Sequence, residues 1–430
     1  MSLHKALGWS SVSAALKIGL GFFSAKVSAV YLGPAGMVLV GQINNFMQVT
    51  AGAIGNGANT AVVNLSAEHA GSRDALRHLW GSAMRLVLTI AAFTAIVVAL
   101  LASPLSSWLF FTPAYWPVVV AAGIVLVLAV ADNVVTGALN GLKQVNSIAQ
   151  AGILAACVEF AVFVSMTYAF GVWGALLAMT FVYGVRLAIS CSVAFQSGVM
   201  QPRDLWRRVD RRMVRDVVSF YPMLLAHSIA LPLGLLLVRG IVVRAVGLEQ
   251  GGYLQAAWRL SDVYVAVLTT ALGLFFMAQF SSLSAEWERG AMLRRTIVQV
   301  AAVTATAAVG IYLLRDLVVR VVLTPEFLPM TFLLPFQLLG DVCKMACYPL
   351  QMALVSRRRS TVYIAQAIGA PAAYAALTYA AAPTLGVQAA PIAYATAYGC
   401  VFVALAFALR STLTARVATV ATAEREQLAV

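Results

Sequence analysis

Several apolar stretches of this chain contain ionisable side chains, and these residues have the greatest capacity for chemistry. A charge inside a membrane-spanning run is costly, so it usually faces a polar cavity or an oppositely charged partner. When Gly33 is aligned with Gly247, Lys26 falls within one residue of Arg239. Two cations at matching depth across a pseudo-twofold axis would bind a dianion such as a pyrophosphate. The alternative is a pair of buried cations neutralised by acidic side chains of neighbouring spans.

Two further cations, Lys17 and Arg259, are the next candidates for this predicted anion site. Lys17 precedes Lys26 by nine residues, so the two point in opposite directions on a straight helix. They face one cavity only if Gly19 and Gly21 bend the helix between them.

Acidic residues within the apolar runs are candidates for coupling transport to a proton. Asp262 lies one helical turn after Arg259, a spacing at which the two side chains can pair. The pair is either static or a switch, in which Asp262 releases Arg259 when it takes up a proton or when substrate arrives. The other acids, which would act as proton carriers or as counter-ions, are Asp132, Glu159 and Asp341.

Amide side chains are unusually frequent in the segment 42–64. Four of them fall broadly on one helical face: Gln42, Asn45, Asn56 and Asn59. This pattern predicts the wall of a wet cavity that contacts sugar hydroxyls. The alternative is hydrogen bonding between packed helices.

The elements that must position these residues are membrane-spanning helices. The chain is 61% hydrophobic and only 10% charged, whereas soluble domains are about 25% charged. A span needs about 20 mostly apolar residues, and the sequence predicts an all-α integral membrane protein with twelve transmembrane helices. The predicted spans are 7–31, 37–63, 80–102, 116–138, 148–169, 174–196, 217–246, 253–281, 293–314, 331–355, 361–382 and 387–409.

The chain also contains an internal repeat. Residues 170–184 and 385–399 are identical at six of fifteen positions, and FTPAYWP at 111–117 matches LTPEFLP at 323–329. Six spans per half give both halves the same orientation, which predicts a parallel repeat and a transport site between its copies. The predicted domains are an N-terminal lobe (1–202), a linker (203–216), a C-terminal lobe (217–410) and a tail (411–430).

The distribution of Lys and Arg predicts the topology. Clusters such as 203–216 and 357–359 occupy alternate loops, together with both termini, whereas opposite loops such as 103–115 carry no Lys or Arg. Only Arg315 and Arg320 break the pattern. Positive loops stay cytoplasmic, so both termini are predicted to be inside, and most of the net charge of +13 needs no nucleic-acid partner.

The Arg-rich linker has its apolar residues near one helical face. We expect an interfacial helix that rests on anionic lipid; a regulatory docking site is the alternative. The chain lacks the GxSxG, HExxH, Walker and DxD motifs, which argues against an enzyme with a nucleotide or metal site. Its five cysteines lie in apolar runs and are interpreted as packing residues. We expect no cofactor.

Two segments resemble the lipid III flippases of enterobacterial common antigen synthesis, which group with the O-antigen translocases in the multidrug/oligosaccharidyl-lipid/polysaccharide exporter superfamily. One includes Ser2, Lys5, Ala6, Trp9, Lys17-Ile-Gly19, Gly21, Lys26, Ala29-Val30 and Gly33-Pro-Ala-Gly36, and the other is Trp258-Arg-Leu-Ser-Asp262-x-Tyr264. Lys17, Lys26 and Asp262 occupy positions that match these motifs.

The resemblance implies that the protein moves an undecaprenyl-pyrophosphate-linked oligosaccharide from the inner to the outer leaflet of the bacterial inner membrane. It also implies a V-shaped pair of six-helix lobes with alternating access. Candidate partners are a polysaccharide polymerase and a chain-length regulator. A drug/cation antiporter of the same superfamily is the nearest alternative, but it would favour a more acidic cavity. A polysaccharide polymerase or ligase is less suited, because the predicted outer loops are too short for a catalytic domain.

Overall fold

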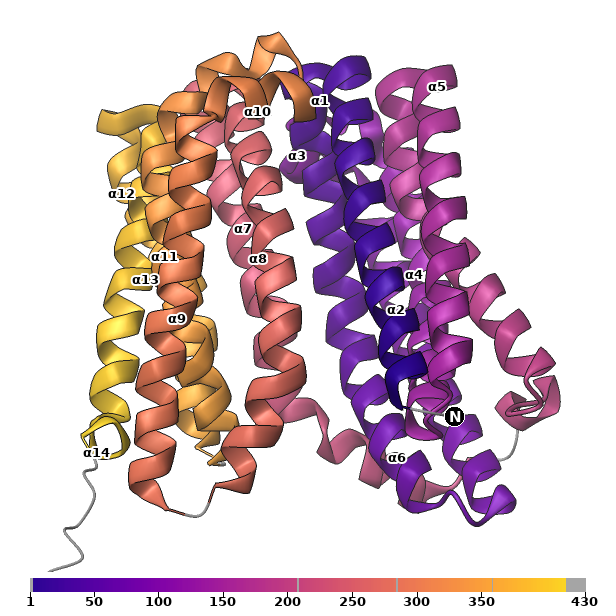
Figure 1. The fold of residues 1–430 in the computed structure, drawn as a ribbon. Coiled ribbons are helices and arrows are strands. Elements are labelled where there is room, and N and C mark those ends of the chain that lie inside the picture. Colours follow the sequence, from indigo (N-terminus) through magenta and orange to yellow (C-terminus); the bar gives the residue numbers. More distant parts are fainter. Residues whose placement is uncertain (1–2, 207–208, 284, 358, 415–430) are drawn as a thin grey trace, which may run out of the picture. The chain divides into compact units, whose positions relative to one another are not determined.

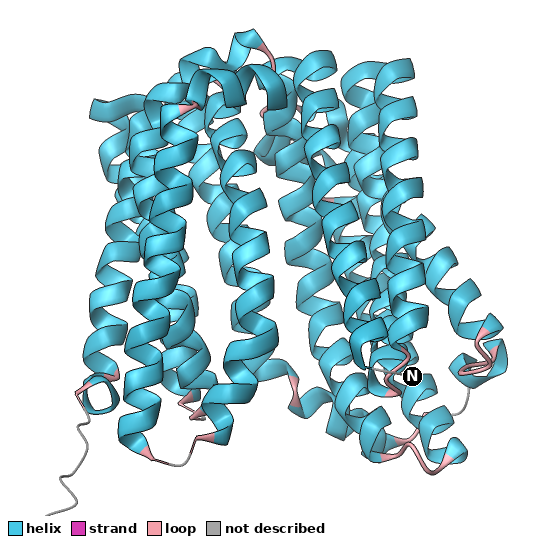
Figure 2. Ribbon diagram, in the orientation of Figure 1, coloured by secondary structure: helices cyan, strands magenta, loops and turns pink. Residues whose placement is uncertain are grey.

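The computed structural model describes residues 3–206, 209–283, 285–357 and 359–414 of the 430-residue chain. In this part of the chain the regular structure is helical throughout (Figure 2). In chain order the elements are α1 (Leu3–Glu68), α2 (Arg73–Leu100), α3 (Ala102–Phe110), η1 (Pro113–Tyr115), α4 (Trp116–Gly141), α5 (Val145–Gln196), η2 (Pro202–Trp206), α6 (Arg211–Ser219), α7 (Tyr221–Val246), α8 (Leu248–Ser282), α9 (Glu286–Leu313), α10 (Arg315–Val322), η3 (Pro325–Leu333), α11 (Leu334–Ser356), α12 (Ser360–Leu385), η4 (Gly386–Gln388), α13 (Ala389–Ala408) and α14 (Arg410–Leu413).

Eight helical stretches of the described chain are long and apolar enough to cross a membrane, which makes this a multi-pass membrane protein. Helix α1 has 66 residues and would be about 100 Å long if straight, far more than the roughly 30 Å of a bilayer core. It is broken at Gly33 (φ 62°, ψ −171°). Helix α5, with 52 residues, is broken in the same manner at Gly171 (φ 56°, ψ −133°).

The internal repeat is visible in the backbone at these breaks. Gly386, at the end of α12, has φ 57° and ψ −133°, within a degree of its repeat partner Gly171. Gly247, between α7 and α8, has φ 91° and ψ 169°, close to the extended ψ of Gly33. Positive φ favours glycine because it has no Cβ. The two halves therefore use the same residue type and the same local geometry to turn between consecutive helices.

The described contacts group the chain into two compact units. The first contains residues 1–256 and 316–329. In this unit α1, α2, α4 and α5 pack together, as the indigo-to-magenta ribbons of Figure 1 show. The indole of Trp80, which is 1% exposed, donates to the Ser66 hydroxyl at 2.9 Å. At Gly141 a Cβ would lie 2.6 Å from the carbonyl oxygen of Val63, so the missing side chain allows α4 to approach α1 closely.

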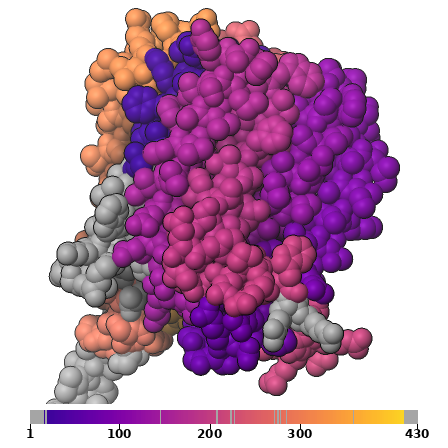
Figure 3. Space-filling view, turned by 90° about the vertical axis from the view of Figure 1, so that its right-hand side faces the viewer, coloured from indigo at the N-terminus to yellow at the C-terminus, as the bar shows by residue number. Residues whose placement is uncertain are grey.

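The linker segment lies against α2 in this first unit. Asp204 is buried and its carboxylate lies 2.9 Å from Nε of Arg77, and the amide of Asp210 donates to the Ser82 hydroxyl at 2.9 Å. In Figure 3 the segment forms the pink area at the lower end of the face that α5 covers in magenta. Among the described residues of the segment, the exposed side chains are Arg203, Trp206, Val209, Arg211, Arg212 and Arg215.

The second unit contains residues 257–315 and 330–430, of which the structure describes those up to Thr414. Here α11 packs on α9 and α13, and α13 packs on α12. The rings of Phe276 and Phe280 are stacked with centroids 5.3 Å apart. At Gly340 a Cβ would lie 2.2 Å from the Tyr394 ring, which fixes the close contact of α11 with α13.

Candidate functional site

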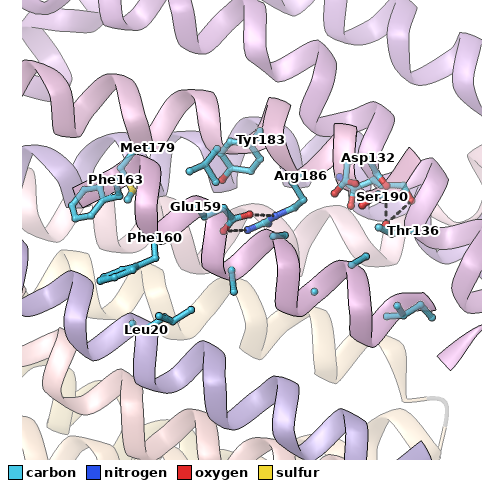
Figure 4. Close-up of a pocket in the computed structure, with 18 of the residues that line it drawn as sticks. Leu20, Asp132, Thr136, Glu159, Phe160, Phe163, Met179, Tyr183, Arg186 and Ser190 are labelled. Carbon is cyan, nitrogen blue, oxygen red and sulfur yellow. Dashed lines mark hydrogen bonds and ion pairs between the residues drawn. The ribbon is translucent and has the colours of Figure 1, made fainter. Parts of the chain in front are cut away.

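The first unit contains a partly open cavity of about 650 Å³ between α1, α4 and the two halves of α5, here called the α4–α5 cavity. Figure 4 shows its labelled side chains in order along the space: Leu20, Phe160, Phe163 and Met179 at one end, Glu159, Tyr183 and Arg186 in the middle, and Asp132, Thr136 and Ser190 at the other. The cavity therefore passes from an apolar end to a polar end.

An ion pair forms the middle of the α4–α5 cavity. Nε and Nη2 of Arg186 donate to the two carboxylate oxygens of Glu159, each at 2.9 Å. This is the bidentate geometry in which guanidinium–carboxylate pairs are strongest. The residues lie in opposite halves of α5, on either side of the Gly171 break, so the turn at this glycine brings them together. The ring of Tyr183 lies 5.7 Å from the guanidinium carbon.

The polar end of the cavity is formed by α4. Asp132, Thr136 and Asn140 are four residues apart, so they share one face of the helix and all three line the cavity. Asp132 is 8% exposed, and its Oδ1 is buried without a hydrogen-bond partner among the described residues. Ser190 of α5 lies beside it (Figure 4). A buried acceptor without a partner is costly, which marks Asp132 as a candidate ligand contact.

A second cavity of about 360 Å³ adjoins the first and shares Asp132, Asn133, Tyr183 and Arg186 with it. Its other polar wall comes from α1 and α7. There the amide of Asn56 donates to the Ser228 hydroxyl at 2.9 Å. Together the two cavities form a partly polar space within the first unit.

Of the four amides predicted to face a glycan, only Asn56 lines either of these two cavities. Gln42 is 2% exposed and its Oε1 accepts from Arg239 at 2.7 Å. Asn45 is buried, and Asn59 donates to the Asn133 carbonyl at 2.7 Å, which joins α1 to α4. The hydrogen bonds from Arg239 to Gln42 and from Asn59 to Asn133 each join two packed helices. For these two amides the structure therefore matches the alternative interpretation, hydrogen bonding between helices.

The sequence interpretation missed the polar face of α4 and the residues Arg186 and Ser190 as cavity walls. A signal was present, since Asp132, Thr136 and Asn140 recur every four residues in an otherwise apolar run. The same spacing relates Arg186 to Ser190 in α5. Neither spacing indicates that this face of α4 meets this face of α5.

The predicted anion-binding cations have separate partners in the structure. The Lys26 ammonium donates to the carbonyls of Arg320, at 3.0 Å, and of Leu323, both at the end of α10 or just after it. Arg239 is 1% exposed and bonded to Gln42. The side chain of Lys17 lies outside the described residues.

The two residues of the predicted pair in α8 differ in exposure. Arg259 is half-buried and Asp262 is exposed. Among the ion pairs described, none joins these two residues.

A different polar cluster surrounds Asp341 in the second unit. This carboxylate is 1% exposed and accepts from the hydroxyls of Tyr264, at 2.5 Å, and Tyr394, at 2.9 Å. The Gln337 amide lies 3.4 Å from Oδ1. Lys344, one turn further along α11, has its ammonium 5.9 Å from the centre of the Tyr394 ring. Asp341 is thus held by donors of its own unit.

Among the described side chains, no group of three His, Cys, Asp or Glu residues is placed to hold a metal ion.

The chain is similar in sequence to known flippases and in fold to known transporters. It is 24% identical over 364 residues to the lipid III flippases of Escherichia coli (strain K12) and Shigella flexneri, covering 85% of this chain and 88% of each relative. The fold is similar to an inward-facing multidrug resistance MATE family transporter of the MOP superfamily, with a TM-score of 0.74, 15% identity and coverage of 95% of this chain and 98% of that one. A family model described as "Polysaccharide biosynthesis protein" matches residues 28–331. Because this match spans well over half of the chain, the protein belongs to that family of polysaccharide biosynthesis proteins.

Proposed function

We propose that this protein is a flippase that moves an undecaprenyl-pyrophosphate-linked oligosaccharide from the inner to the outer leaflet of the bacterial inner membrane. The observation that carries the proposal is the match to lipid III flippases over 85% of the chain, together with membership of a polysaccharide biosynthesis family. The polar space inside a membrane-spanning unit supports it, since such a space can shelter a hydrophilic headgroup during transfer.

The topology that suits this function has twelve crossings and both termini in the cytoplasm. Three of the eight candidate spans are broken, at Gly33, Gly171 and Gly386, and we count each of these as two crossings. With α8 as one further crossing, the total is twelve. The predicted lobes 1–202 and 217–410 are then the two copies of the repeat. The linker 203–216, with Trp206 and several Arg side chains exposed, would rest on anionic lipid at the cytoplasmic surface.

The headgroup and the tail of the substrate require different surroundings. Lys26 and Arg239 are the proposed contacts of the pyrophosphate, with Lys17 and Arg259 as further cations, while the polyprenyl tail stays in lipid. For Lys26 to bind substrate, its ammonium must leave the Arg320 and Leu323 carbonyls. The proposed coupling acids are Asp262, Asp132, Glu159 and Asp341.

The test is translocation in proteoliposomes. The protein would be reconstituted with the lipid-linked oligosaccharide that accumulates in cells lacking it, and appearance of the glycan on the opposite leaflet would be measured by lectin or enzymatic accessibility. We expect transfer with the protein and none with empty vesicles. Transport of a cationic drug without transfer of the lipid would instead support the antiporter of the same superfamily.

The Lys26 and Arg239 proposal has its own test. Lys26→Ala and Arg239→Ala should each weaken binding of undecaprenyl pyrophosphate about tenfold to a hundredfold, since a charge-assisted hydrogen bond is worth roughly 1.5–3 kcal/mol. Lys26→Arg should retain more binding than Lys26→Gln. Unchanged affinity in both folded Ala variants would assign these cations a structural role.

A further inference from the structure

We propose that the α4–α5 cavity is a subsite for a neutral, hydroxyl-rich sugar residue of the transported glycan, an inference that rests on the flippase function proposed above. The sequence placed the glycan-facing amides on α1. The structure points instead to α4 and to the second half of α5, whose polar side chains line the larger cavity of the first unit (Figure 4).

The size of the cavity suits a small polar ligand. Its volume of about 650 Å³ falls within the range of roughly 300–1,000 Å³ typical of small-molecule sites. The adjoining cavity of about 360 Å³ shares four wall residues with it. A sugar residue in the first cavity therefore leaves room for a second sugar of the same chain in the next.

The hydrogen-bonding groups at the polar end match those of a sugar. Oδ1 of Asp132 is a buried acceptor without a partner among the described residues, and a sugar hydroxyl donates to such an acceptor. Asn140 and Asn44 line the same space and carry amides that both donate and accept. A hydroxyl also both donates and accepts, so a polyol can satisfy this mixed set.

The opposite end of the cavity is aromatic and apolar. Phe160, Phe163 and Met179 line this end, and Tyr183 adds a further ring in the middle of the cavity (Figure 4). A pyranose ring has an apolar C–H face besides its hydroxyl rim, and aromatic rings offer a large apolar surface for such a face. A cavity that passes from aromatic to amide and carboxylate groups thus fits a ligand with both kinds of surface.

The charges in the cavity select against an anionic group. Arg186 has both donors of its fork bonded to Glu159, so its positive charge is already neutralised. Asp132 adds a further acidic group near this pair. The pyrophosphate of the substrate would be repelled here, which restricts the proposal to a neutral sugar and leaves the headgroup to the cations elsewhere.

The experiment compares two lipids on the intact protein in nanodiscs. One is undecaprenyl pyrophosphate, and the other is the oligosaccharide-bearing form that accumulates in cells lacking the protein. For Asp132→Asn and Asn140→Ala we expect binding of the glycosylated lipid to weaken about tenfold, with binding of the bare lipid unchanged. Ala156→Leu, which adds bulk to the cavity wall, should have the same selective effect. The matched control is Asn64→Ala, whose exposed amide bonds only within α1 and should alter neither affinity.

Three results would overturn the subsite. In the first, the folded variants weaken both lipids equally; in the second, they leave the glycosylated lipid as tightly bound as in the wild type. In the third, Asp132→Asn changes only the pH dependence of translocation, which would leave Asp132 with the coupling role alone and without a sugar contact. If the wild-type protein binds neither lipid, the flippase function fails together with the subsite, whereas each of the three results leaves that function standing.

Discussion

Two buried carboxylates, one in each unit, have opposite surroundings. Asp132 of the first unit lines a cavity, and its Oδ1 has no hydrogen-bond partner among the described residues. Asp341 of the second unit accepts from two tyrosine hydroxyls and is 1% exposed. A carboxylate whose acceptors are already satisfied contributes to the cohesion of its unit, whereas one that faces a cavity remains able to bind a ligand.

The repeat makes this comparison sharper. The offset that aligns FTPAYWP with LTPEFLP also aligns Asp132 with Lys344, so one position carries an acid in one copy and a base in the other. Lys344 lies near the rings of Tyr394 and Tyr398, at 5.9 and 5.7 Å. The second unit also has a cavity, of about 320 Å³ between α8 and α9, but apolar side chains form most of its wall. The two copies of the repeat share their turn geometry, whereas the charged and polar side chains in their interiors differ.

The largest expected effect is on the stability of the second unit. Asp341→Ala removes the acceptor of Tyr264 and Tyr394. Each buried donor left unsatisfied costs about 1–3 kcal/mol, so for two donors we expect a loss of about 2–6 kcal/mol. Thermal unfolding of the purified protein in detergent measures this. Asp132→Ala is the matched control, with an expected loss below about 1 kcal/mol. Equal losses of unfolding free energy in Asp341→Ala and Asp132→Ala would show that the two carboxylates contribute equally to stability.

A smaller effect is expected for the ion pair of the first unit. Arg186→Ala leaves Glu159 without its partner, and because the Arg186 side chain is 43% exposed, we expect a cost of about 2 kcal/mol rather than that of a fully buried pair. Adding Glu159→Ala should then restore part of the stability, with a coupling of about 0.5–3 kcal/mol. Additive losses in the double-mutant cycle would show that the pair is not coupled.

The glycine breaks should respond alike in both copies. Gly171→Ala and Gly386→Ala each place a Cβ at positive φ, which costs roughly 1–2 kcal/mol. At Gly171 that Cβ has no neighbour within 4 Å, so the expected cost there is backbone strain alone. Gly310→Ala, inside α9 and also unobstructed, is the control and should be neutral or slightly stabilising. Unequal losses at 171 and 386 would indicate that the equivalent turns carry different strain.

The smallest effect on folding is expected at Asp262, an exposed acid in α8. Asp262→Asn keeps the shape and removes the titratable charge. We expect normal expression and unchanged thermal unfolding, with impaired translocation in the proteoliposome assay. Full activity of this variant at all pH values would exclude a proton switch at this position and leave Asp132, Glu159 and Asp341 as the acids to test.

Much of the fold follows from local sequence. Long apolar runs predict membrane-spanning helices because the bilayer demands that backbone groups be satisfied within each segment. The repeat pairs Gly171 with Gly386 in the sequence, and the structure has the same backbone turn at both. The repeat itself is a property of the sequence, since residue identities at a fixed offset need no coordinates.

Less of the candidate site than of the fold could be predicted from the sequence, because the site depends on tertiary structure. Helical spacing shows which residues share a face, but not which other helix that face meets. The donors that saturate Asp341 lie 77 and 53 residues away in the sequence, and Glu159 meets Arg186 only because α5 turns back at Gly171. By itself the sequence determined that acids and bases stand inside membrane helices. Only the packing of those helices decided which of them are neutralised and which face a cavity, because pairing depends on distances in space that local periodicity does not encode.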